Sequence, residues 1–162
     1  MVNVQDLTVN QAFLPSESIL FAYFTGRCHT ANIMALRSHT ERLIKVCPLG
    51  TRPAVLLFVD TPATIGTRGR HTTSELITAM SGKLAAFVLC VEANWAWRSM
   101  FRSAVGAGLI LSRKDYPVVV ATDLEESARV FSKAAVKLDF VAAGEARLAL
   151  RHAVRSVGQR LK

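Results

Sequence analysis

Three uninterrupted apolar runs, each followed by a segment of helical character, constrain the fold of this chain more than any other feature. The runs are Pro53–Asp60, which ends in an acid, Leu84–Val91 and Pro117–Ala121. Continuous apolar runs of this length are typical of strands buried on both faces of a parallel sheet. Strands that alternate with helices predict an α/β sheet with right-handed crossovers. We therefore expect these three strands to lie side by side, with their ends at a common edge.

The N-terminal region predicts a strand pair and a first helix. Asn3–Val9 alternates polar and apolar residues, and Ile19–Phe24 is a β-prone run, so we expect the two to pair antiparallel. Apolar residues recur at roughly helical spacing between Thr30 and Val46, which indicates a helix there. The region therefore adds an antiparallel edge to the sheet.

Each apolar run is followed by a segment that favours a helix. These segments are Thr72–Met80, a helix from about Asn94 to Leu111, and one that begins at Leu124, for which Thr122 or Asp123 can serve as the cap. The fold prediction is a single α/β domain with a mixed, mostly parallel sheet, an N-terminal antiparallel pair and about four helices. A basic C-terminal helix follows, so we divide the chain into a domain of residues 1–138 and an extension of residues 139–162.

The C-terminal helix is basic because three arginines recur every four residues and share one helical face, namely Arg147, Arg151 and Arg155. We expect the opposite face, with Leu148, Val154 and Leu161, to be apolar. The basic face can be solvated, or it can dock an acidic protein or a second copy of the chain. Nucleic acid ranks last, because neither a recognition-helix motif nor an aromatic stacking platform accompanies the arginines.

Composition points to an acidic partner and excludes several other classes. The 162 residues include 20 Lys and Arg against 12 Asp and Glu, which gives a net charge of +8 and favours acidic partners. No apolar run approaches the ~20 residues of a membrane span, and residues 1–6 lack the features of a signal peptide. We therefore expect a cytoplasmic protein. The three cysteines form no Cys-x-x-Cys pair, and we interpret them as small, reduced, mostly buried residues.

Enzymatic and metal-binding motifs are not found in the sequence. It contains no P-loop, no dinucleotide fingerprint and no Gly-x-Ser-x-Gly elbow. The four histidines are scattered without metal-ligand spacing, so we expect them on the surface or at helix caps: His29, His39, His71 and His152. We expect neither a cofactor nor an enzymatic activity.

The order of elements resembles a known family. The segments that carry the resemblance are the strand end Val59-Asp60-Thr61, the strand Ala86–Val91, the Trp- and Arg-bearing helix after it, Tyr116-Pro117-Val118, and the helix start Asp123-Leu124-Glu125-Glu126. Between about Val4 and Lys137 the chain resembles the STAS-like domain of bacterial anti-sigma-factor antagonists, and within it a divergent branch. The resemblance implies sequential strand order, helices packed against the sheet, and regulation or scaffolding by docking a protein partner such as a regulatory kinase or an anti-sigma-like factor.

In phospho-regulated members of that family, a partner kinase modifies a Ser or Thr near the start of the helix after the third strand. Thr61 and Thr64 are the closest positional matches, although the segment departs from the usual Asp-Ser-Ser-Gly-like sequence. Arg68 and Arg70 would pair with an added phosphate near a helix N-terminus. The alternative is that these hydroxyls only shape a polar loop, as such residues routinely do.

Two functional hypotheses remain open. In the first, a protein partner docks on two segments: the polar segment that follows the apolar run Pro53–Asp60, and the helix expected after the apolar run Leu84–Val91. The residues expected to bind it are Asp60, Arg68, Arg70, Trp97, Arg98 and Arg102. In the second, the chain is a small-ligand-binding or enzymatic α/β domain, with a pocket at the strand ends formed by Asp60, Thr61 and Glu92.

Overall fold

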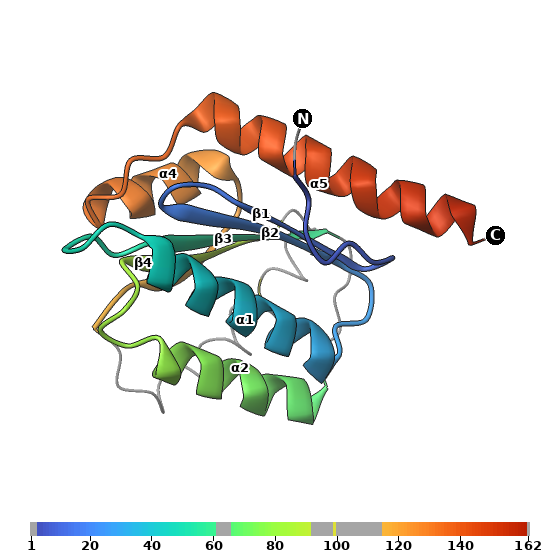
Figure 1. Ribbon diagram of the computed structural model, residues 1–162, viewed down its shortest axis with the longest axis horizontal. Coiled ribbons are helices and arrows are strands. Elements are labelled where there is room, and N and C mark those ends of the chain that lie inside the picture. Colours follow the sequence, from blue (N-terminus) through green and yellow to red (C-terminus); the bar gives the residue numbers. More distant parts are fainter. Residues whose placement is uncertain (1–2, 61–65, 92–98, 100–114, 162) are drawn as a thin grey trace.

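The computed structural model describes residues 3–60, 66–91, 99 and 115–161 (Figure 1). Its strands are β1 (Gln11–Pro15), β2 (Ile19–Thr25), β3 (Ala54–Asp60), β4 (Ala86–Val91) and β5 (Val118–Ala121). Its helices are α1 (Thr30–Val46), α2 (Thr67–Ala79), α4 (Leu124–Lys133) and α5 (Phe140–Arg160). The helix expected from Asn94 lies outside the described residues.

The described strands form one mixed sheet in sequential order, β1-β2-β3-β4-β5. β1 and β2 are antiparallel, and every later neighbouring pair is parallel. This confirms the predicted α/β class, with a mostly parallel sheet and an N-terminal antiparallel pair. The three apolar runs on which the prediction rests are β3, β4 and β5, and they lie side by side as expected.

The first strand differs from the prediction. β1 is not Asn3–Val9 but the segment that follows it, and it joins β2 through a connection of three residues. Asn3–Val9 contributes only an isolated bridge between Gln5 and Phe13, and Asp6 interrupts its extended backbone with a φ of 44°. A short hairpin closes at less entropic cost than a longer loop, and β1 also buries Phe13 completely.

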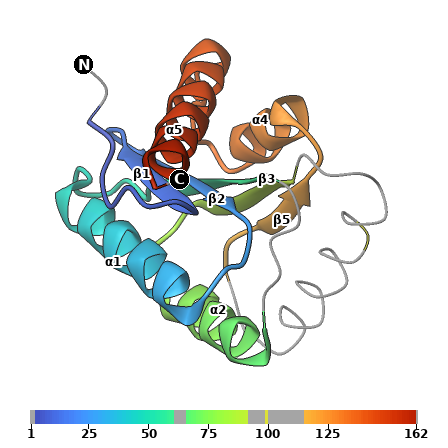
Figure 2. The same cartoon turned by 90° about the vertical axis from the view of Figure 1, so that its right-hand side faces the viewer.

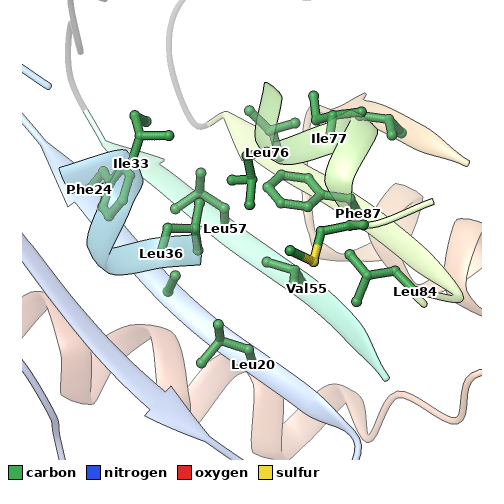
Figure 3. Packing of buried hydrophobic residues seen from close by; sticks show 14 of the residues in the cluster. Leu20, Phe24, Ile33, Leu36, Val55, Leu57, Leu76, Ile77, Leu84 and Phe87 are labelled. Atoms are coloured by element: carbon green, nitrogen blue, oxygen red, sulfur yellow. The ribbon is translucent and has the colours of Figure 1, made fainter. Parts of the chain in front are cut away.

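Helices cover both faces of the sheet, which gives three layers (Figures 1 and 2). α1 and α2 lie on one face, and α4 and α5 on the other. The alternation of side chains along β3 separates two cores: Val55 and Leu57 pack towards α1 and α2 (Figure 3), whereas Leu56 and Phe58 belong to the core beneath α4 and α5. Both faces of β3 are buried, as its unbroken apolar sequence predicts.

α2 begins earlier than the sequence predicts. Its first residue is Thr67 rather than Thr72, because Gly66 takes the extended conformation of an N-cap residue. Arg68 and Arg70 therefore lie in the first turn of a helix and not in a loop. In contrast, α1 has the predicted bounds, and Asp123 caps α4 by accepting a hydrogen bond from the backbone N–H of Glu126 at 2.8 Å.

α5 packs on β1 and β2 through a face that differs from the predicted one. The buried residues of this face are Ala143, Ala146, Leu150 and Val154. Val154 is buried as expected, but the expectation was wrong for Leu148 and Leu161, which are 60% and 74% exposed. Ala143, Ala146 and Leu150 lie on one side of the helix and Leu148 on the opposite side, so packing the first three on the sheet turns Leu148 towards solvent.

Candidate functional site at the carboxyl edge of the sheet

The carboxyl ends of the central strands meet at one edge of the sheet. Val59 is the register partner of Val91, and Cys90 is the partner of Ala121, so β3, β4 and β5 end next to one another. β2 ends at the same edge, since Thr25 pairs with Asp60. Open α/β sheets usually bind their ligands at this edge. Asp60 is thus placed where the sequence predicted it.

A polar cluster surrounds the Asp60 carboxylate. Asp60 follows Leu56 and Phe58 on the face of β3 that is covered by α4 and α5, so its side chain faces α5. The Tyr23 hydroxyl of β2 donates a hydrogen bond of 2.8 Å to Asp60 Oδ2. Nε of Arg151 lies 3.1 Å from the same oxygen. The cluster therefore links β2, β3 and the C-terminal helix.

The cluster is partly buried, with the Asp60 and Arg151 side chains 18% and 33% exposed. Burial raises the pKa of Tyr23 above its ordinary range, and the hydrogen bond to Asp60 and its negative charge add to the shift, whereas Arg151 and Arg155 oppose it. Nε of Arg151 is buried and makes no hydrogen bond within the described residues, so its approach to Asp60 is an ion pair rather than an aligned hydrogen bond. Tyr23 thus acts as a hydrogen-bond donor, not as a nucleophile.

The first turn of α2 presents positive charge at the same edge. Gly66, the N-cap residue, has no side chain to satisfy the first backbone N–H groups, and the first turn contains no acidic residue. Arg68 and Arg70 are exposed, and neither has an ion-pair partner in the part of the chain that the structure describes. The helix dipole adds positive potential here.

Other arginines extend this positive edge. Arg27 is exposed in the connection between β2 and α1, and Arg155 and Arg160 are exposed in the last turns of α5. Figure 2 faces this edge, with the start of α2 below the sheet and the end of α5 above it. We call this set the basic arc; it consists of Arg27, Arg68, Arg70, Arg155 and Arg160.

The structure brings together only part of the predicted site. Asp60 and Arg151 form an ion pair, so the carboxylate expected to bind a partner is already engaged within the chain. Arg147 and Arg155 lie on the same flank of α5 as Arg151. The remaining predicted residues fall outside the described residues: Thr61, Thr64, Glu92, Trp97, Arg98 and Arg102.

The sequence prediction missed Tyr23. A usable signal was present: Tyr23 is a hydroxyl-bearing residue within the apolar run Ile19–Phe24, two residues before the partner of Asp60. Two-residue alternation places Tyr23 and Asp60 on the same face of neighbouring strands. As a β-prone run, Ile19–Phe24 predicts a strand, but this pattern alone assigns no role to the Tyr23 hydroxyl.

One histidine is buried, contrary to prediction. His39 is 3% exposed, stacks on Phe13 with ring centroids 4.4 Å apart, and places Nε2 2.6 Å from Asp6 Oδ2. It occupies the inner face of α1, where a flat ring packs as an apolar group would. His29 is the N-cap residue of α1, and His71 and His152 are exposed, as expected.

The cysteines largely match the prediction. Cys28 and Cys90 are buried thiols, and burial raises the pKa of Cys28 to about 12, whereas Cys47 is partly exposed. Within the described ranges, no three His, Cys, Asp or Glu residues come together in a way that could hold a metal ion. None of the helices in those ranges is both long enough and apolar enough to cross a bilayer.

Comparison of the chain with models of protein families, with curated proteins and with solved structures finds no match.

Proposed function

We propose that this chain is a non-enzymatic regulatory or scaffolding domain of the STAS-like kind, which docks an acidic protein surface on the basic arc. The resemblance implies sequential strand order and helices packed on the sheet. The β1-β2-β3-β4-β5 order agrees with the first expectation, and the helices on both faces of the sheet agree with the second. This agreement supports the kinship without depending on any single motif.

The observation that carries the proposal is the exposed pair Arg68 and Arg70 in the first turn of α2. Guanidinium groups bind carboxylates and phosphates through paired N–H donors, and the start of α2, where Gly66 has no side chain to serve as a cap, adds further N–H groups. The pair follows the end of β3, at the edge where α/β sheets bind their ligands. A partner with carboxylates or a phosphorylated residue suits this surface.

The carboxylate of the polar cluster is unsuited to a free docking role. Asp60 is held by Tyr23 and Arg151, so we assign it to fixing α5 on the sheet rather than to partner binding. The partner-binding role moves to the arginines of the basic arc. Modification of Thr61 or Thr64 by a partner kinase would add negative charge a few residues before Arg68 in the sequence, and the added charge would weaken the binding of an acidic partner.

The test compares two double variants that change the net charge equally. Arg68→Glu with Arg70→Glu reverses charge at the carboxyl edge, and Lys83→Glu with Lys137→Glu reverses it at exposed positions outside the helices. We expect quantitative cross-linking and mass spectrometry in the cells that make the protein to show partners lost only in the first variant. Equal loss in both variants, or retention in both, would overturn the proposal.

A ligand-binding or enzymatic domain is the second candidate, favoured by the polar residues that converge at the strand ends. It predicts that a metabolite raises the melting temperature of the wild type and that Tyr23→Phe or Asp60→Asn removes this effect. A docking domain predicts no such shift, together with the charge-dependent loss of partners described above.

A further inference from the structure

The outer face of α5 carries apolar side chains that the fold leaves exposed. Val141 and Leu148 are 68% and 60% exposed, and they lie seven residues apart, hence on one side of the helix. Together with Glu145, His152 and Arg155 they form what we call the outer stripe. This stripe points away from the sheet, because the opposite side of α5 supplies the buried contacts to β1 and β2.

The outer stripe is complementary to itself in the antiparallel orientation. At 1.5 Å per residue, a two-fold axis through Leu148 places Glu145 within about 2 Å, along the helix axis, of His152 of the second copy. The same axis places Val141 level with Arg155 of the second copy, whose aliphatic stem can cover it. The two Leu148 side chains meet at the centre.

The order of polar residues along the outer stripe also favours antiparallel contact. Glu145 is the only acidic residue within α5, and it lies on the N-terminal side of Leu148, whereas His152 and Arg155 lie on the C-terminal side. An antiparallel pair therefore brings the Glu145 carboxylate of each copy level with the His152 ring of the other copy, whose N–H can donate a hydrogen bond to it. Equivalent residues at 152 in the two copies stand about 12 Å apart along the axis, which avoids close repulsion between like side chains.

We infer that this chain forms a two-fold symmetric dimer through antiparallel contact between the outer stripes of two α5 helices. The occupant is a second copy rather than an acidic partner, because an acidic surface would leave Glu145 facing like charge at the centre of the contact. The inference does not rest on the proposed docking function. Arg68 and Arg70, the pair that carries that proposal, lie on α2, which covers the other face of the sheet, and the two surfaces share only Arg155.

The contact area of two helix faces is small, so the dimer should be weak. Stable assemblies usually bury more than roughly 1,000 Å² of total accessible surface. We expect dissociation in the micromolar range, measurable by analytical ultracentrifugation of the full chain at physiological ionic strength, where the Debye length of about 8 Å screens the net charge of each copy. A wild type that remains monomeric up to millimolar concentration overturns the inference.

Leu148→Glu places two carboxylates at the two-fold axis and should raise the dimer Kd by roughly tenfold or more. Glutamate is a good helix former and the position is exposed, so the fold should be retained, as circular dichroism can verify. Met34→Glu makes the same change at an exposed position of α1 and should leave the Kd unchanged. Equal Kd values for Leu148→Glu and the wild type refute the contact.

A charge exchange tests the antiparallel pairing itself. His152→Glu places a carboxylate opposite Glu145 of the other copy, and Glu145→Lys removes the carboxylate that accepts from His152, so each should weaken the dimer. The double variant pairs a lysine with a glutamate across the contact and should recover it. The two positions are seven residues apart in one helix, about 10 Å, so they cannot form an ion pair within the same helix. A double variant weaker than both single variants contradicts the pairing.

Discussion

Nε of Arg151 on α5 lies 3.1 Å from Oδ2 of Asp60, the last residue of β3. The same oxygen accepts the hydroxyl hydrogen of Tyr23 on β2. One carboxylate oxygen thus joins the C-terminal helix to two central strands, at the edge of the sheet that the basic arc surrounds. The pair anchors the half of α5 that lies nearest this edge.

We expect Arg151→Gln to lower the free energy of unfolding by about 1–2 kcal/mol, because Asp60 loses its counter-charge in a partly buried environment. The loss should be smaller than the ~3–5 kcal/mol of a fully buried pair, since a third of the Arg151 side chain is exposed. Urea unfolding followed by circular dichroism measures the change.

Arg160→Gln is the control for this prediction, because it removes the same charge at an exposed position of the same helix. A double-mutant cycle between Arg151→Gln and Asp60→Asn should give a coupling energy near ~1 kcal/mol. Equal effects of Arg151→Gln and Arg160→Gln would show that the ion pair does not stabilise the fold.

The central strands could be predicted because their signal is local and strong. A continuous apolar run bounded by Gly, Pro or an acid indicates a buried strand without any knowledge of its neighbours. β3, β4 and β5 therefore appeared in the sequence almost with their observed bounds. The common edge at Asp60 followed from the rule that parallel strands end together.

The edge strand and the face of α5 could not be predicted in the same way. Asn3–Val9 has the better alternation, yet β1 pairs with β2 because it is nearer in the chain and buries Phe13. The side of α5 that meets β1 and β2 carries the small residues Ala143 and Ala146, whereas the larger apolar Leu148 lies on the exposed side. Both outcomes depend on three-dimensional packing that residue patterns do not specify.

The pairing of His39 with Asp6 should hold the N-terminal segment on the domain. Asp6→Asn removes the charge, and asparagine tolerates the φ of 44° at this position as aspartate does. The change in stability therefore reports the loss of the contact with His39 and not a strain in the backbone. We expect a loss of about 1 kcal/mol, because buried His39 loses a charged partner.

Hydrogen exchange can locate this effect. The backbone N–H of Gln5 donates to the carbonyl of Phe13 at 2.8 Å, so its amide reports whether the segment is docked. Asp6→Asn should accelerate the exchange of this amide several-fold, and Glu17→Gln, an exposed change in the β1–β2 connection, should not. Unchanged exchange at Gln5 in Asp6→Asn would contradict the role of the pair.

The thiols should differ in reactivity. Burial raises the pKa of Cys28 from 9.0 to about 12, so the thiolate fraction at a given pH near neutrality falls roughly a thousandfold, in addition to the loss of access. Partly exposed Cys47 should therefore react with iodoacetamide well before Cys28 and Cys90, as peptide mass spectrometry can measure. In urea all three should react at similar rates. Native labelling of Cys28 as fast as that of Cys47 would be inconsistent with its burial.

Asp115 should make the fold sensitive to acid. Its Oδ1 accepts hydrogen bonds from the backbone N–H of Gly82 at 2.7 Å and from the Ser81 hydroxyl at 3.1 Å, and Arg52 lies 3.1 Å from its other oxygen. The hydrogen bond from Gly82 is the largest cause that lowers the pKa of Asp115 below its ordinary 3.8, with smaller contributions from Ser81 and Arg52.

Because the pKa of Asp115 is lower in the folded state than in the unfolded state, the unfolded state binds the proton more readily as the pH falls. The stability that Asp115 contributes is therefore fully present at neutral pH, begins to be lost near 3.8, and is gone once the pH has fallen through the lowered folded pKa.

Asp115→Asn removes this titration. We expect the stability difference between wild type and variant, measured by urea unfolding between about pH 6 and about pH 2, to shrink as the pH falls. Glu17→Gln serves as the control for a carboxylate lost in a surface turn, and a wild type–Asp115→Asn difference that is constant over this range would rule out the linkage.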